Sequence, residues 1–204
     1  VLNSAAGNYL FLYAGREMAQ LNQERAAITV GFSKKLEVSG GKVKSWKSSN
    51  TKIATVAKNG KVTAKRVGKC KITAILTTGE KLTCTVNVRK NVYTASKLTA
   101  ADVSYGNSGA NVYNMSYDRK GNLVIRVRYV NKIGYTVKKL ESMRIKVTNE
   151  NGKVIGVYSG AKSMTVASGS SKDFTVTIKK AKLKIKGKQD LANASASLTG
   201  KSIY

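Results

Sequence analysis

Histidine and proline are absent from this sequence of 204 residues, and acidic residues are scarce. Without histidine, zinc sites built on imidazole and Ser-His or Cys-His catalysis are excluded. Without proline there are no Pro-rich linkers. Only 10 Asp and Glu accompany 37 Lys and Arg, so a paired-acid hydrolase site or a multi-carboxylate calcium cage is hard to build. We therefore expect no catalytic activity, no bound metal and no cofactor.

The formal net charge is +27, and it is spread along the whole chain. Residues 1–90 carry 17 basic and 4 acidic side chains, and residues 91–204 carry 20 and 6. The hydrophobic fraction of 42% is ordinary, so the chain is expected to fold. A folded protein with this charge attracts polyanions, which include nucleic acid, anionic wall polymers, acidic glycans and anionic lipid. Charge alone does not choose among them.

Long apolar runs are also missing. The longest, Tyr9–Ala14, is far below the ~18 residues that cross a membrane. It is also short for a signal-peptide core and has no basic leader. We expect no membrane span in this chain, and for an exported protein we expect the signal peptide to lie outside this sequence.

Apolar and polar residues alternate repeatedly, which is typical of half-buried strands. The clearest alternations cover residues 82–88, 123–129, 143–147 and 174–178. Turn signals separate them, at Asn59-Gly60, Thr78-Gly79, Lys120-Gly121-Asn122 and Asn151-Gly152. This pattern predicts an all-β protein. One segment, Asn8 to Arg25, tolerates a helix but fits equally well a strand borrowed from a preceding domain.

Seven sequence blocks follow one another between Ile28 and Val88. They are Ile28-Thr29-Val30-Gly31, Lys35-Leu36-Glu37-Val38, Trp46-Lys47-Ser48-Ser49-Asn50, Ile53-Ala54-Thr55-Val56, Gly60-Lys61-Val62-Thr63-Ala64, Gly68-Lys69-Cys70-Lys71-Ile72-Thr73-Ala74 and Thr83-Cys84-Thr85-Val86-Asn87-Val88. In this order they resemble a group 2 bacterial immunoglobulin-like domain.

The resemblance implies a small β-sandwich of extracellular bacterial proteins, which serves as a spacer or binding module and not as a catalyst. Some relatives bind calcium, but only Glu37 and Glu80 are available in this segment, so calcium is not carried over. The expected core residues are Trp46, Ile53, Val56, Ile72 and Val86.

Residues 103–204 resemble accessory immunoglobulin-like domains at the C-terminal end of Gram-positive secreted proteins. The features that carry this are the runs Gly121–Val127, Asn151–Ile155 and Asp190–Ala194, with Asn131 after the first. We therefore predict two immunoglobulin-like β-sandwich domains in tandem. The expected boundaries are an N-terminal extension at 1–18, a first domain at 19–90, a connector at 91–102 and a second domain at 103–204.

Cys70 and Cys84 permit one disulfide, which would imply an oxidising compartment. Both are expected to point into the same core. In a hairpin turning at Thr78-Gly79, Cys84 would lie opposite about Thr73, and that offset strains the roughly 7 Å limit between bridged Cα atoms. A bulge or a cross-sheet path would bring the two sulfurs together, and the alternative is two buried free thiols.

Lysine recurs at every second position from Lys180 to Lys188, namely at Lys180, Lys182, Lys184, Lys186 and Lys188. On a strand these ammonium groups would lie about 6.6–6.8 Å apart on one face. That row is either a track for a polyanion or an edge strand protected by lysine against aggregation. Arg126 and Arg128 would extend the basic face, together with Arg144 and Lys146, if their strands are neighbours.

The favoured function is a non-catalytic, structural or adhesive module at the cell surface or in secreted form. Its expected partners are anionic wall polymers or host glycans and proteins, with further domains of a larger surface protein beside it. No motif of a specific nucleic-acid reader is present. The alternatives are a sequence-independent nucleic-acid binder, or the accessory region of a secreted enzyme whose catalytic domain lies outside this sequence.

Overall fold

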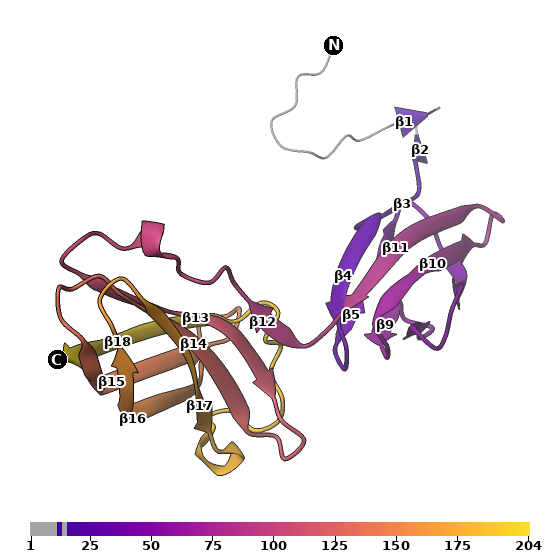
Figure 1. The fold of residues 1–204 in the computed structure, drawn as a ribbon. Helices are drawn as coiled ribbons and strands as arrows, with labels where there is room; N and C mark the ends of the chain where they lie inside the picture. Colours follow the sequence, from indigo (N-terminus) through magenta and orange to yellow (C-terminus); the bar gives the residue numbers. More distant parts are fainter. Residues whose placement is uncertain (1–11, 14–15) are drawn as a thin grey trace. The chain divides into compact units, whose positions relative to one another are not determined.

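The computed structural model describes residues 12–13 and 16–204, with side chains from Met18 onward. It divides into two compact units, with the boundary between Lys90 and Asn91 (Figure 1). Within the described residues the regular structure is β-strand, apart from two short 3₁₀ turns, η1 (Ala100–Asp102) and η2 (Lys180–Lys182). The all-β prediction is confirmed, and the four clearest alternations lie within strands β11, β14, β15 and β17, whose bounds follow.

The first unit has a main sheet in the order β4-β11-β10-β7. These strands are β4 (Arg25–Thr29), β11 (Lys81–Arg89), β10 (Gly68–Leu76) and β7 (Val43–Ser48). A second sheet contains β5 (Ser33–Lys35), β9 (Lys61–Ala64) and β8 (Ala54–Val56), and two short pairs join β1 (Leu12–Tyr13) to β2 (Arg16–Glu17) and β3 (Gln20–Leu21) to β6 (Val38–Ser39). β4 runs parallel to β11, and the other neighbours in the main sheet are antiparallel.

The core of this unit is built from the inner faces of both larger sheets. Of the expected core residues, Ile72 and Val86 are fully buried, whereas Trp46, Ile53 and Val56 are half-buried and pack against the buried cluster. Leu36, Ala54 and Val62 complete its centre. The sequence blocks therefore place their large apolar side chains in or beside one core.

The helix considered for Asn8 to Arg25 is not formed in the described part of that segment, which contains strands β1, β2, β3 and the start of β4. The reason is visible in β4, where Ala26 and Ile28 are buried and Arg25 and Ala27 are exposed. This alternation matches a strand, and it allows β4 to pair with β11. Residues 1–11 and 14–15 of the expected extension lie outside the described residues.

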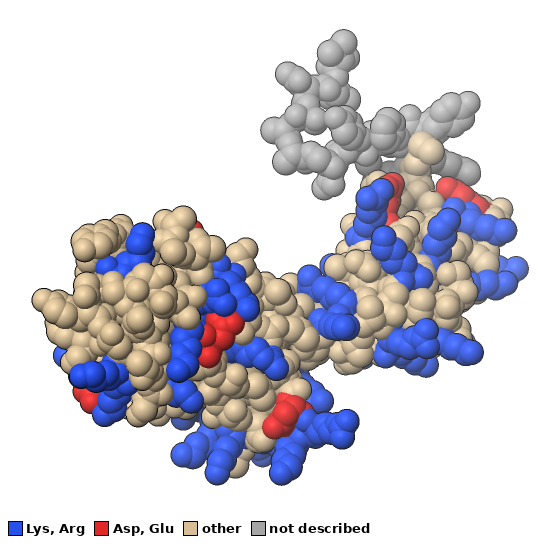
Figure 2. Space-filling model, viewed as in Figure 1, with Lys and Arg blue, Asp and Glu red and all other residues tan. Residues whose placement is uncertain are grey.

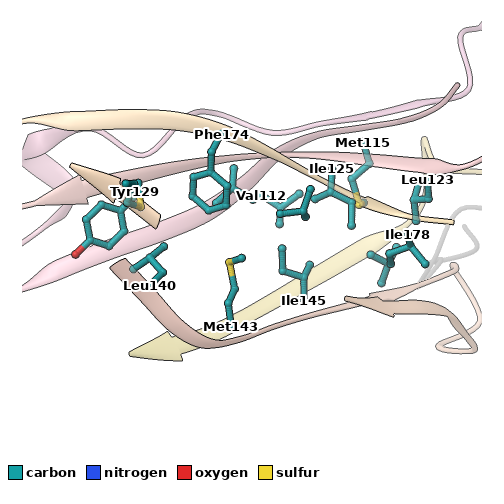
Figure 3. Close-up of a cluster of buried hydrophobic side chains, with 14 of the residues drawn as sticks. Val112, Met115, Leu123, Ile125, Tyr129, Leu140, Met143, Ile145, Phe174 and Ile178 are labelled. Carbon is teal, nitrogen blue, oxygen red and sulfur yellow. The ribbon is translucent and has the colours of Figure 1, made fainter. Parts of the chain in front are cut away.

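The second unit contains two sheets. One has the order β12-β13-β14-β17, with β12 (Val92–Thr94), β13 (Ser108–Tyr117), β14 (Leu123–Asn131) and β17 (Ser171–Ile178); the other has the order β16-β15-β18, with β16 (Val154–Val166), β15 (Val137–Thr148) and β18 (Ser195–Ile203). Figure 3 shows their inner faces: Val112, Ile125 and Phe174 of the first sheet face Met143 and Ile145 of β15. These side chains bury one apolar layer between two sheets, which is the arrangement of a sandwich.

The segment 91–102, expected as a connector, is part of the second unit. β12 pairs with β13, placing Tyr93 opposite Met115. Asn91 donates from Nδ2 to the carbonyl of Gln189 at 3.0 Å, and its Oδ1 accepts from the backbone N–H of Leu191 at 2.7 Å. The start of the expected connector is thus ordered, with Asn91 bonded to the loop before β18 and residues 92–94 paired in the sheet.

Candidate anion-binding groove

The lysine-rich segment 179–188 does not form the strand predicted from its alternation. The backbone N–H of Lys182 donates to the carbonyl of Lys179 at 2.8 Å, and that of Leu183 donates to Lys180 at 3.2 Å, which closes the η2 turn. Lys184 N–H then donates to the carbonyl of Ile155 on β16 at 2.8 Å. Leu183 and Ile185 pack half-buried against the core. Because the two apolar residues fold inward around a turn, the lysines do not share one face.

Asn122, in the turn between β13 and β14, fixes the start of this segment. Its backbone N–H and its Nδ2 donate to the two carboxylate oxygens of Asp118 at 2.9 and 2.8 Å. Its Oδ1 accepts from the backbone N–H of Lys180 at 2.9 Å. The hydrogen bond from the Asn122 side chain also lowers the pKa of Asp118. The turn and the lysine-rich segment are thus joined by one amide.

Tyr117 fixes the other end of the segment. Its hydroxyl accepts from the backbone N–H of Gln189 at 3.1 Å, and burial raises the pKa of this phenol. The segment is therefore held at both ends and at Lys184, while the lysine side chains between these points remain exposed.

Between the turn and the lysine-rich segment lies a groove of about 960 Å³. Six cationic side chains line it: Arg119, Lys120, Lys179, Lys180, Lys186 and Lys188. Its apolar surface comes from Tyr117, Ala181, Leu183 and Ile185. No carboxylate belongs to the described lining. We refer to this site as the basic groove.

A smaller pocket of about 520 Å³ lies on another side of the same segment. Lys182, Lys184 and Arg144 line it, with Val157 and Ser159 of β16. Ala181 and Leu183 line both this side pocket and the basic groove. The lysine-rich segment therefore forms a ridge that distributes its charges to two sides.

The structure brings together only part of the predicted basic set. Lys180, Lys186 and Lys188 lie in the basic groove, and Lys182 and Lys184 lie in the side pocket. Arg119, Lys120 and Lys179 were not predicted to line a site. The turn signal at Lys120-Gly121-Asn122 marked their position, but the sequence does not show that this turn packs beside the lysine-rich segment.

Arg126 and Arg128 lie elsewhere. They are on β14, whereas Arg144 and Lys146 are on β15 in the other sheet, so the four do not form one continuous face. Arg126 donates to Oδ1 of Asn114 at 2.7 Å. Arg128 forms an ion pair with Asp173 at 2.6 Å, and Lys97 contacts the same carboxylate at 2.8 Å.

The carboxylate of Asp173 supports a prediction about how stability depends on pH. The hydrogen bond from Arg128, followed by that from Lys97, lowers the pKa of Asp173 from 3.8 to about 2. Because the folded pKa lies below the unfolded one, this stabilisation is present above pH 4 and is lost as the pH falls toward 2. We expect Asp173→Asn to lower the free energy of unfolding by about 1–2 kcal/mol at neutral pH, after allowance for solvent screening. The difference should vanish at low pH.

Urea unfolding followed by circular dichroism at several pH values measures this effect. Glu150→Gln is the matched control, since Glu150 is exposed and changes the net charge equally. A stability difference for Asp173→Asn that persists unchanged at low pH would contradict the electrostatic origin.

Both cysteines are free and buried. Cys84 pairs with Ile72 and Cys70 pairs with Val86, so the register differs by one residue from that expected. The thiols are diagonal neighbours on the inner face, where Cα atoms are about 7–8 Å apart and too distant for an unstrained bridge. Burial raises the pKa of both thiols, which keeps them protonated and unreactive.

Figure 2 shows how the charges are placed on one face. Lys and Arg cover parts of both units with few acidic side chains between them, and they gather at the end of the second unit below β17. The described residues contain no group of three or more Cys, Asp or Glu side chains that could hold a metal ion. Among the described residues, no helix has the length and apolarity needed to span a membrane.

Comparison with known proteins identifies the first unit. Residues 17–86 match the bacterial Ig-like domain (group 2), which confirms the resemblance found between Ile28 and Val88. No curated protein matches the chain. Among solved structures, one alignment is to CBM51-2 in complex with GlcNAc and INT domains from Clostridium perfringens ZmpB, at 8% identity and a TM-score of 0.23. It covers 91% of this chain, which spans about half of that one (47%).

Proposed function

Since residues 17–86 form a bacterial Ig-like domain of group 2, we propose that this chain is a non-catalytic module of a secreted or cell-surface protein. The basic groove of the second unit binds anionic polymer, and the Ig-like domain acts as a spacer. The observation that carries the proposal is the groove itself, with six cations and an apolar floor on a well-anchored backbone.

Two further features support a binding role over a purely structural one. The ion pairs of the described residues are Lys35–Glu37, Lys97–Asp173, Arg128–Asp173 and Lys139–Glu141. None of these pairs uses a cation of the groove, so an incoming anion would not have to displace an internal partner. A preorganised backbone also lowers the entropic cost of binding.

The test is neutralisation of three groove lysines in the variant Lys180→Gln/Lys186→Gln/Lys188→Gln. Each lysine that contacts a phosphate releases counterions, so at about 0.1 M salt the loss of three contacts should weaken binding on the order of 100-fold. Co-sedimentation with purified Gram-positive cell walls, with and without teichoic acids and over a salt series, measures it. Binding should disappear when the teichoic acids are stripped.

The matched control is Lys44→Gln/Lys52→Gln/Lys58→Gln, which removes the same charge from exposed positions of the first unit. This control variant should bind cell walls no more than about threefold more weakly than the unchanged protein, because salt screens long-range electrostatic attraction. Equal losses for the two variants would mean that net charge, and not the groove, determines binding. Affinity that does not change up to high salt would also contradict the proposal.

A nucleic-acid role is the competing interpretation, and the groove offers it little support. Sequence-independent binders of single strands stack bases on exposed aromatic side chains. Tyr117 is the aromatic residue among those that line the described groove, and its hydroxyl is engaged by Gln189. Oligothymidylate that binds as tightly as wall polymer at equal salt would favour the nucleic-acid role.

A further inference from the structure

The basic groove and the side pocket share a wall, and this geometry bears on the shape of the ligand. Ala181 and Leu183 line both sites. The two sites are therefore adjacent and are separated only by the lysine-rich ridge. An anion that fills one site lies next to the other.

The lysine side chains of the ridge are divided between its two sides. Lys180, Lys186 and Lys188 line the groove, while Lys182 and Lys184 line the side pocket, where Arg144 of β15 joins them. All of these side chains extend from exposed positions, and none takes part in a described ion pair. That of Lys180 also approaches the turn at Gly121. Together with Arg119, Lys120 and Lys179, nine cations surround one ridge.

The ridge cannot easily move aside to merge the two sites. Its backbone is bonded to Asn122, to the carbonyl of Ile155 and to Tyr117. Leu183 also packs closely on β16, since a Cβ added at Gly156 would lie 3.3 Å from a Leu183 methyl. A ligand that contacts all nine cations must therefore pass over the ridge.

We propose that the ligand is a linear, phosphate-bearing polymer that crosses the ridge and occupies the basic groove and the side pocket together. A single phosphate or a short oligomer fills only the groove. This inference rests on the proposed function and adds the length and path of the ligand. Exposed Ala181 and half-buried Leu183, which line both sites, accommodate the uncharged part of a repeat between two anionic groups.

Length dependence separates this arrangement from a simple basic patch. The salt dependence of binding scales with the number of contacts, so log K against log salt should have a slope of about −4 for a chain confined to the groove and about −6 for one that uses all nine cations. The probes are tripolyphosphate and long-chain polyphosphate, with isothermal titration calorimetry of the full chain over a salt series. The association constant for long-chain polyphosphate is expressed per bound chain, so that it can be compared with that for tripolyphosphate.

Two variants distinguish the sites. Arg144→Gln/Lys182→Gln/Lys184→Gln should weaken long-chain binding at least tenfold, on the contact counts above. Tripolyphosphate binding should fall about threefold or less, by the loss of net charge alone. The groove variant Lys180→Gln/Lys186→Gln/Lys188→Gln should weaken both. The first-unit variant Lys44→Gln/Lys52→Gln/Lys58→Gln is the control for net charge, and thermal unfolding checks that each protein is folded.

The outcomes are distinct. If the side-pocket variant leaves long-chain affinity unchanged, or weakens both probes equally, the crossing path is wrong and the groove alone remains. If neither probe binds at low salt and walls do not bind either, the proposed function itself fails. Binding of wall polymer with a slope near −6 that falls in the side-pocket variant would identify the natural ligand class, whereas the same behaviour with oligothymidylate alone would assign the path to nucleic acid.

Discussion

Replacing Asn131 with alanine is expected to destabilise the second unit by about 3–5 kcal/mol. The carbonyl of buried Val166 and the N–H of half-buried Ile133 lose their partner, as does the carbonyl of Tyr135. Asn131 is fully buried at the end of β14. Its Nδ2 donates to the carbonyls of Tyr135 and Val166 at 2.9 and 2.8 Å, and its Oδ1 accepts from the N–H of Ile133 at 3.0 Å. One side chain thus joins the β14–β15 loop to the end of β16.

Hydrogen exchange measured by mass spectrometry on peptides of β14, β15 and β17 follows this loss. Trp46 is the single tryptophan of the chain and lies in the first unit, so its fluorescence reports unfolding of the first unit separately. The matched control is Asn151→Ala, at an exposed turn position, which should change stability by less than about 0.5 kcal/mol. An effect of Asn131→Ala as small as that of the control would show that water replaces the amide.

Strand positions could be predicted well from the sequence because burial alternates along single strands. In β11, Cys84, Val86 and Val88 are buried and the residues between them are exposed. The lysine-rich segment shows the limit of this reasoning. Its alternation has the same period, but it lies beyond the last pairing of β17, where Leu123 pairs with Ile178. Because this segment forms no strand pairing, the hydrogen bonds of the η2 turn, the bond from Lys184 to Ile155 and the burial of Leu183 determine its path.

Only one side of the basic groove could be predicted from the sequence. The lysines of residues 180–188 are evident in the sequence, whereas the contribution of Arg119 and Lys120 depends on the hydrogen bond between Asn122 and Lys180, residues 58 positions apart. The same limit applies to Arg128. Sequence alone gives it a free charge, but β14 pairs with β17 so that Arg128 lies opposite Asp173. Contacts across a sheet depend on strand order, which alternation does not specify.

In the first unit, the largest effect is expected at Gly60, in the Asn59-Gly60 turn. Its φ is +81°, and a Cβ at this position would lie 2.2 Å from the carbonyl oxygen of Leu36 and 3.1 Å from the Trp46 ring. The backbones cannot separate easily, since Leu36 N–H donates to the Gly60 carbonyl at 3.0 Å. We expect Gly60→Ala to cost about 3 kcal/mol or more, from the unfavourable φ together with the displacement of Leu36.

Gly79→Ala separates these two contributions. Gly79 has a φ of +92° in the β10–β11 turn, but a Cβ there would meet nothing within 4 Å. It should therefore cost only about 1 kcal/mol, for the left-handed backbone alone. Urea unfolding followed by Trp46 fluorescence measures both variants on the same unit. Equal losses would show that the approach of Gly60 to Leu36 relaxes without cost, whereas a larger loss for Gly60→Ala assigns the difference to the contact of the turn with Leu36 and Trp46.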